Sequence, residues 1–205
     1  MRCKNCSKEV IYEINDICQL CFINEEKPTK NNQEHWLYVY NEKNFEIDES
    51  NQESMDELLA NPFNIRIEND KIIFSNTKGE VVEKVLTVES IDEVARIRNF
   101  VSGKWLLFEH EFDIDSTWIK IGKATIEGEL GPSSKVSTAL SSSKSKRYVI
   151  CVYTMDYLNL DDVNRVREKL REMGFRKEIN YKPDIYTDLG IYKDTSIISP
   201  TRYKS

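Results

Sequence analysis

Apolar and polar residues follow strand-like patterns in several short segments of the chain. Residues 35–40 are rich in β-forming aromatic residues and predict a first strand. Residues 63–67 and 71–75 each alternate apolar with polar positions, and Glu68-Asn69-Asp70 between them predicts a hairpin turn. Residues 105–109 predict a buried strand, and residues 148–154 predict another.

Apolar residues recur at helical spacing in three longer segments, and residues 53–60 predict a short helix before an Asn-Pro pair. The first of the longer helices is expected to start at Ser90, which forms a capping box with Glu93, and to stop at Gly103. The second is expected to follow Asp115, and the third to start at Asn159 and stop at Gly174. Their apolar faces are Val94, Ile97 and Val101; Trp118, Ile121 and Thr125; and Val163, Val166 and Leu170.

Because strands and helices are intermixed and a hairpin is evident, we predict an α+β fold. The expected architecture is a curved, mainly antiparallel sheet with helices packed on one face. Composition divides the chain into a cysteine-rich unit at residues 1–24, a polar linker at residues 25–34 and one α+β domain at residues 35–205.

Four of the five cysteines form two Cys-x2-Cys pairs, Cys3 with Cys6 and Cys18 with Cys21. Two such pairs complete the tetrahedral four-thiolate shell of a structural zinc ion, so we predict a small zinc ribbon. Since protein ligands fill all four positions, this zinc is not expected to be catalytic. Disulfide pairing and a rubredoxin-like iron site are the alternatives. Cys151 lies in an apolar strand and is expected to belong to the core.

Composition and charge are those of an ordinary globular protein, with 40% hydrophobic and 31% charged residues. No run of apolar residues is long enough for a membrane span, and the polar N-terminus lacks the apolar region of a secretory signal. We therefore expect a cytoplasmic protein, a setting that favours metal binding over disulfides. The net charge of −6 is uneven: residues 1–100 carry 12 Lys+Arg against 20 Asp+Glu, and residues 101–205 carry 17 against 15.

A basic stretch lies in the second half of the chain, where residues 130–155 contain no acid. Such a stretch can contact phosphate even in an acidic protein, because nearby charges count most. A solvated Ser/Lys loop is the alternative. The basic residues of the stretch are Lys135, Lys144, Lys146 and Arg147.

From residue 103 onward the sequence resembles the Bles family, typified by the basophilic-leukaemia-expressed protein. The segments that carry the resemblance are GKWLLF (103–108), GELG (128–131) with KVST (135–138), VYTMD (152–156) with DVNRVR (162–167), and YKPDIYTDLGIY (181–192). The resemblance implies a fold similar to that of the cap-binding translation initiation factor 4E. The cysteine pairs lie outside it, as an added module.

In the initiation factor 4E fold, a basic loop contacts the cap phosphates, and the corresponding region here contains Lys144, Lys146 and Arg147. The cap base is held in that factor between two loop tryptophans. Here the three tryptophans, Trp36, Trp105 and Trp118, all lie in strand or helix patterns. Without an aromatic clamp in the loops, base stacking worth roughly 1–3 kcal/mol is missing, so cap binding is not predicted.

The favoured function is binding of RNA or of a phosphate-bearing nucleotide by the sheet and the basic loop, with the zinc unit as a contact for a protein partner or nucleic acid. The polar and aromatic segment 181–192 has two interpretations. It could line a pocket or cover a sheet edge, or it could be a structural C-terminal strand whose hydroxyl groups bond the backbone, which is the favoured interpretation. A cleft shared by Lys135 and Lys182 would support a ligand site, whereas opposite faces would dismiss it. The expected ligand-binding residues are Lys135, Lys144, Lys146, Arg147, Lys182 and Tyr186.

Two alternatives belong to other classes of function. Members of the Bles-like family are sometimes labelled phosphothreonine lyases, a chemistry that needs a base and an acid beside a phosphate pocket. Lys104, Lys135 and His110 could be assembled that way, although no local motif demands it. A protein-interaction module without nucleic acid is the other alternative.

Overall fold

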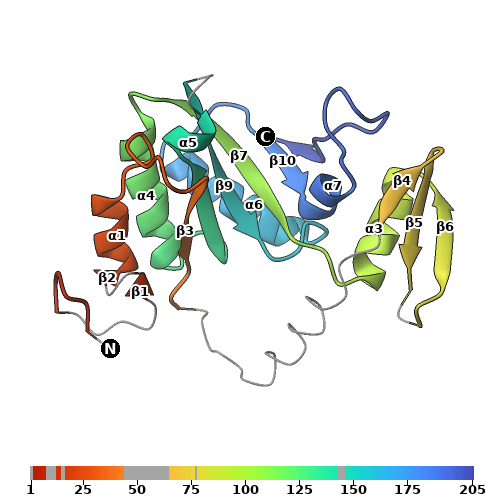
Figure 1. The fold of residues 1–205 in the computed structure, drawn as a ribbon, viewed down its shortest axis with the longest axis horizontal. Helices are drawn as coiled ribbons and strands as arrows, with labels where there is room; N and C mark the ends of the chain where they lie inside the picture. The colour runs from red at the N-terminus through yellow and green to blue at the C-terminus, as the bar shows by residue number, and fades with distance from the viewer. Residues whose placement is uncertain (1, 8–12, 15–16, 44–64, 77, 143–145) are drawn as a thin grey trace.

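The computed structural model describes residues 2–7, 13–14, 17–43, 65–76, 78–142 and 146–205. These residues form a six-stranded sheet, a three-stranded sheet and a two-stranded ribbon, joined by helices (Figure 1). The predicted α+β class is therefore confirmed. The helix predicted at residues 53–60 lies outside the described residues.

The large sheet is antiparallel throughout, and its strands lie in the order β11-β10-β7-β9-β8-β3. The strands predicted at residues 35–40, 105–109 and 148–154 are β3, β7 and β9 of this sheet. β10 forms the first part of the C-terminal strand considered for residues 181–192, whereas β8 and β11 were not predicted. The bounds are β3 (Trp36–Tyr40), β7 (Gly103–His110), β8 (Ser133–Ser137), β9 (Arg147–Thr154), β10 (Asn180–Pro183) and β11 (Tyr203–Lys204).

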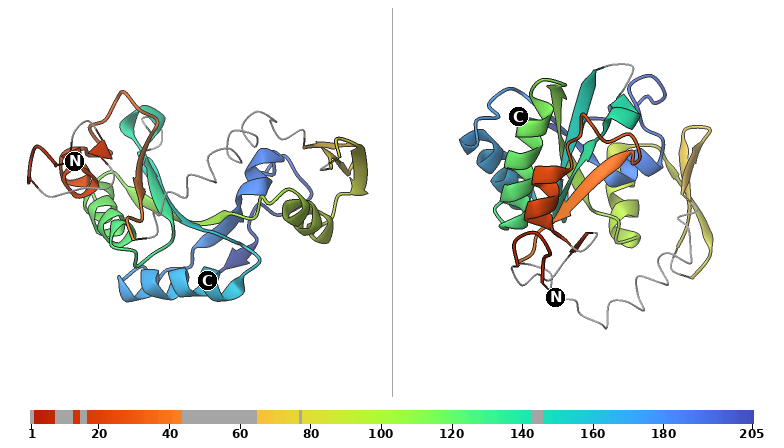
Figure 2. Two further views of the ribbon diagram at one scale, coloured as in Figure 1. Left: turned by 90° about the horizontal axis from the view of Figure 1, so that it is seen from below. Right: turned by 60° about the vertical axis from the view of Figure 1, so that its left-hand side comes forward.

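Helices α4 (Ile114–Ile126) and α6 (Leu160–Glu172) cover the convex face of the curved sheet, as Figure 2 shows from below. The side chains of Trp105 on β7 and Trp118 on α4 are fully buried in this layer. Trp105 also donates its indole N–H to the carbonyl of Val163 in α6 at 3.0 Å. Helices packed on one face of an antiparallel sheet are therefore confirmed, and the other face is concave.

Sequence signals at the ends of α6 act as predicted. The Asn159 side chain caps the helix by accepting the backbone N–H groups of Asp161 and Asp162. Gly174 follows the helix with a φ of +101°, the left-handed region that favours glycine. No helix within the described residues is both long and apolar enough to cross a membrane.

Helix α3 (Val88–Ile97) begins and ends earlier than the sequence predicts. Its N-cap is Thr87, whose hydroxyl accepts the N–H of Ser90 at 3.1 Å, so Ser90 lies inside the helix. Its end is a Schellman turn with Asn99 in the left-handed region at φ 49°, a role that asparagine can take in place of glycine. The predicted stop, Gly103, is instead the first residue of β7.

The small sheet contains β4 (Arg66–Glu68), β5 (Lys71–Ser75) and β6 (Val81–Val85). The predicted hairpin between β4 and β5 is confirmed. Its turn has two residues, Asn69 and Asp70, both with positive φ, as the favoured hairpin turns require. Strand β6, in which Val81 and Val85 are exposed, was not predicted.

The N-terminal segment contains a two-stranded ribbon, β1 (Glu13–Ile14) with β2 (Ile17–Cys18), and helix α1 (Gln19–Glu25). Helix α1 packs against α4, where Ile23 is buried beside Gly122. The Gln19 side chain bonds both backbone groups of Tyr40 on the edge strand β3. Beyond α1, Thr29 bonds the Asp115 carboxylate through its backbone and its hydroxyl. The cysteine-bearing segment is thus anchored on the large domain.

Candidate functional site

Three lysines from the central strands β7, β8 and β10 lie on the concave face of the large sheet. Successive side chains of a strand point to opposite faces, and Trp105 and Tyr181 pack toward the helices. Lys104 and Lys182 are therefore on the concave face, directly opposite each other in the β7–β10 register. Lys135 on β8 lies on the same face, beside the Tyr153 ring at 5.6 Å from its centroid. The structure thus places Lys135 and Lys182 on one face of the sheet.

Lys135 has an aromatic environment. Its Nζ lies 4.4 Å from the ring centroid of Trp36 and 5.6 Å from those of Tyr38 and Tyr153. Within the described part of the chain, no carboxylate or hydrogen-bond acceptor contacts this ammonium. Burial lowers the pKa of Lys135, because removal from water disfavours the charged form. Lys135 is therefore a half-buried cation surrounded by rings and lacking an anionic partner.

The other two lysines differ in their partners. Lys104 forms an ion pair with Asp184 at the start of helix α7 (Asp184–Asp188). The Lys182 ammonium donates to the carbonyl of Ile191 at 2.8 Å and lies 3.7 Å from the ring centroid of Tyr192. Burial, and secondly the charge of Lys104, lowers the pKa of Lys182 to about 8. Lys104 is thus neutralised locally, whereas Lys182 has only neutral partners.

Only some residues of the predicted basic loop belong to the concave face. Lys144 lies outside the described residues. Lys146 is exposed and forms an ion pair with Glu111 at 3.1 Å. Arg147 opens β9 opposite His110 and, by strand alternation, points to the concave side. Of the two described loop residues, Arg147 is the one that the structure places with the concave-face lysines.

Tyr186 does not join this group. It lies in α7 with an exposed fraction of 1%, and burial raises the pKa of its hydroxyl. Its side chain is part of the core beside Arg202 and Asp92, so it offers no surface to a ligand.

A cavity of 520 Å³ opens on the Arg147 end of the concave face. Sequence reasoning named Arg147 and Lys135 but missed the aromatic residues Trp36, Tyr38, Tyr153 and Phe108 around them. The alternation of Trp36 and Tyr38 within one strand was the available signal, since it puts both rings on one face. The cavity is lined by Trp36, Phe108, Ser137, Ser141, Ser142, Arg147 and Val149.

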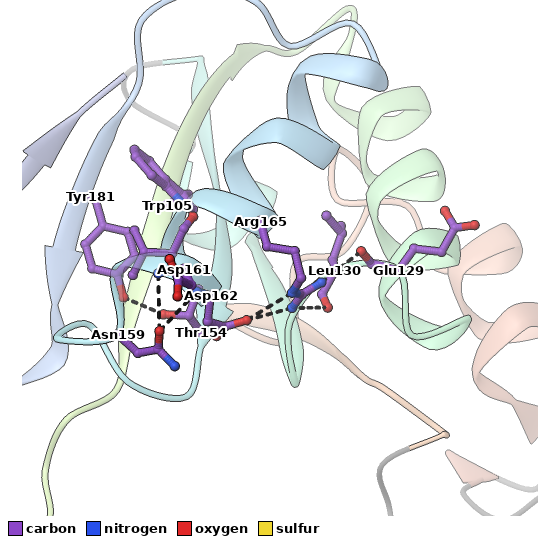
Figure 3. A network of polar contacts seen from close by, with 10 residues as sticks. Trp105, Glu129, Leu130, Thr154, Asn159, Asp161, Asp162, Arg165 and Tyr181 are labelled. Atoms are coloured by element: carbon purple, nitrogen blue, oxygen red, sulfur yellow. Dashed lines mark hydrogen bonds and ion pairs between the residues drawn. The ribbon is translucent and has the colours of Figure 1, made fainter.

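A network of polar contacts fixes the turn that leads into β8, the strand to which Lys135 belongs (Figure 3). Arg165 of α6 donates to the carbonyl of Leu130 at 3.2 Å. At the next residue, Gly131, the backbone lies so close to β9 that a Cβ would be 1.7 Å from the carbonyl oxygen of Tyr153. Only glycine allows this approach.

We expect Gly131→Ala to lower the free energy of unfolding by at least about 1–3 kcal/mol, the usual cost of overpacking. Urea denaturation measures the change. Gly79→Ala is the matched control, because no atom lies within 4 Å of the added Cβ and only its positive φ is strained. Equal costs for the two variants would contradict the close approach at Gly131.

The four N-terminal cysteines converge. One ligand atom from each of Cys3, Cys6, Cys18 and Cys21 lies within 4.8 Å of the others. The Cys3–Cys21 and Cys6–Cys18 sulfur distances are 3.8 and 3.7 Å. A tetrahedron with metal–sulfur bonds of about 2.3 Å has edges of about 3.8 Å, so the arrangement fits a four-thiolate metal ion. Backbone N–H groups of Cys18 and Cys21 also point to cluster sulfurs.

Comparison with solved structures finds initiation factor 4E proteins at low sequence identity. The eIF4E-3 of Ascaris suum with m2,2,7G cap is 17% identical, with 84% of this chain and 96% of that chain covered and a TM-score of 0.38. A schistosome eIF4E complexed with m7GpppA and 4E-BP is 13% identical, with 84% and 97% covered and a TM-score of 0.41.

Comparison with protein families gives a match over most of the chain. The model of the basophilic leukemia-expressed protein Bles03 matches residues 22–190, which include the whole concave face except β11 but only the end of the cysteine-bearing segment. The segments that resemble the family from residue 103 onward reach two residues past this match. The chain belongs to the Bles03 family.

Proposed function

We propose that the chain binds RNA or a phosphate-bearing nucleotide on the concave face of its large sheet. The observation that carries this proposal is Lys135, a half-buried ammonium with three rings around it and no anionic partner among the described residues. A buried charge without a counter-ion is costly, and an anionic group of a ligand would supply the missing partner.

The charge balance of the face favours an anion. Asp184 forms an ion pair with Lys104, whereas the direct contacts of the Lys135 and Lys182 ammonium groups are neutral, namely aromatic rings and the carbonyl of Ile191. The lowered pKa values of Lys135 and Lys182 have burial as their first cause, so both ammonium groups gain from a nearby negative charge. Phosphate is such a group.

The aromatic side chains favour a ligand with bases. Tyr38 is 40% exposed on β3, and Trp36 is partly exposed on the same face. Single-stranded nucleic acids are commonly bound by positively charged surfaces with aromatic side chains on which bases stack. Cations and rings on one concave surface therefore support a nucleotide or a single strand over a bare inorganic anion.

We expect Lys135→Gln to weaken the binding of a short single-stranded RNA and of nucleoside monophosphates, because the substitution removes the charge that lacks a partner. Fluorescence anisotropy with a labelled RNA, at two salt concentrations, measures the effect. If Lys135 contacts one phosphate, the log–log dependence of affinity on salt should become flatter by about 0.7.

Lys123→Gln is the matched control, since it makes the same charge change on an exposed position of α4, on the convex side. It should leave affinity and salt dependence close to those of the wild type. Equal binding by the wild type and Lys135→Gln would contradict the proposal.

We further propose that the metal of the cysteine cluster is zinc, with a structural role. Four thiolates in a closed tetrahedral shell are the ligand set of structural zinc sites. The cluster belongs to the segment that holds α1 against α4, so the ion would stabilise that attachment.

The geometry does not favour the enzymatic alternative. His110 and Lys104 are six residues apart on β7, which corresponds to about 20 Å along a strand. His110 instead stacks on Phe112, with a ring-centroid distance of 4.8 Å. An acid and a base at these two positions cannot act on one phosphate group.

A further inference from the structure

We propose that the 520 Å³ cavity beside Arg147 binds the base of a guanosine 5′-phosphate unit, and that it selects guanine without a methyl group on N7. This inference rests on the proposed function, because the phosphate of the same nucleotide would meet Lys135. It adds the identity of the base, its position and the direction in which the nucleotide lies.

Two aromatic side chains stand at opposite sides of the cavity. Trp36 comes from the edge strand β3 and Phe108 from β7, and the strands between them contribute Ser137 and Val149. The pairs Trp36–Ser137 and Phe108–Val149 lie directly opposite in their registers, so the four side chains form one row across the sheet. Phe108 is 54% exposed although it is apolar. Such a row gives the cavity an aromatic side chain at each end, on which a flat ligand ring can stack.

The polar groups of the cavity favour guanine. Arg147 lines it, and none of the described residues of its lining carries a carboxylate. Arginine binds guanine through the two acceptors O6 and N7, whereas adenine offers a donor in place of O6. Methylation at N7 removes one acceptor and puts a positive charge on the base, next to the Arg147 guanidinium. An unmethylated guanine is therefore the base that fits this charge pattern.

The distance to Lys135 fits one nucleotide. Lys135 and Ser137 are two residues apart on β8, which is about 7 Å along a strand. Lys135 also contacts the Trp36 ring that lines the cavity. A base stacked in this cavity would thus have its 5′-phosphate on the side of Lys135.

Tryptophan fluorescence gives a direct readout of this position. Trp105 and Trp118 are buried in the core at 1% and 0% exposure, so Trp36 is the tryptophan that a ligand can reach. Guanosine 5′-monophosphate should quench the fluorescence of the full chain, whereas ribose 5-phosphate should bind more weakly and without quenching. A short RNA that begins with a 5′-phosphorylated guanosine tests whether the same unit is taken from an RNA end.

Two variants test the stacking of the base on Phe108 and the recognition of its O6 and N7 acceptors by Arg147. Phe108→Ala should weaken guanosine 5′-monophosphate binding about 5- to 150-fold, the range of roughly 1–3 kcal/mol for one stacked base, and leave ribose 5-phosphate unaffected. Phe112→Ala is the control, since Phe112 is 84% exposed at the same end of β7 but does not line the cavity. N7-methylguanosine 5′-monophosphate should bind the wild type about 5- to 150-fold more weakly than the unmethylated nucleotide, and Arg147→Gln should reduce that difference.

The outcomes separate this inference from the proposed function. Equal affinity for guanosine 5′-monophosphate and ribose 5-phosphate, with binding still dependent on Lys135, would overturn the base site alone. Equal or tighter binding of the N7-methylated nucleotide would overturn the assignment of Arg147 to the acceptor edge. Absence of binding by every phosphate probe and by RNA would overturn both proposals.

Discussion

Replacing Cys18 with serine is expected to abolish metal binding and to lower the thermal stability of the chain. Cys18 supplies one of the four converging sulfurs and is also the N-cap of α1. Its Sγ accepts the backbone N–H of Cys21 at 3.4 Å. Helix α1 carries the buried Ile23 onto α4. Structural zinc can contribute on the order of 10 kcal/mol to the folding of small metal domains, so this effect should be among the largest of any single substitution.

Elemental analysis and thermal unfolding check the prediction. The wild type should contain one zinc per chain and Cys18→Ser none, with a lower melting temperature that a chelator reproduces in the wild type. Cys151→Ala is the matched control, because Cys151 is a buried thiol on β9 outside the cluster. A native wild type with four free thiols and no metal would contradict the zinc assignment.

The elements that could be predicted are those whose buried sides are apolar. β7, β9, α4 and α6 have such sequences, and their positions follow from periodicity. The start signal predicted for α4 was wrong, because the helix begins at Ile114 and the Asp115 carboxylate bonds Thr29 instead. β8 was missed because its sequence, Ser-Ser-Lys-Val-Ser, has one aliphatic residue. Its inward-facing Ser134 is buried, and the Ser134 hydroxyl forms a 2.7 Å hydrogen bond with the hydroxyl of Thr125 on α4. The local sequence does not reveal this tertiary contact.

The candidate sites show the same division between local and long-range information. The cysteine cluster could be predicted because the spacing of the four ligands along the sequence is typical of metal sites. Lys135 could be named from charge, but its surrounding rings come from β3 and β9, and only the strand order brings them together. Tyr186 looked available because of its polar neighbours. It is buried because residues 184–188 form a helix that turns it into the core.

Trp105→Ala is expected to lower the free energy of unfolding by about 3–5 kcal/mol, as for other buried aromatic truncations. The indole is 1% exposed, donates to Val163 at 3.0 Å and meets the Tyr181 ring edge-on at 5.1 Å. It also lies under the guanidinium of Arg167, 5.8 Å from the ring centroid. Truncation would leave a cavity between the sheet and α6.

Phe108→Ala is the matched control for the stability measurement, since it removes an aromatic ring from the same strand on the opposite face. Phe108 is 54% exposed, so its loss should cost less than about 1 kcal/mol, the usual range for surface positions. Chemical denaturation of both variants compares the two faces of β7. A cost for Trp105→Ala as small as that for Phe108→Ala would mean that the helices do not cover this strand. The convex face would then be as open to a ligand as the concave face.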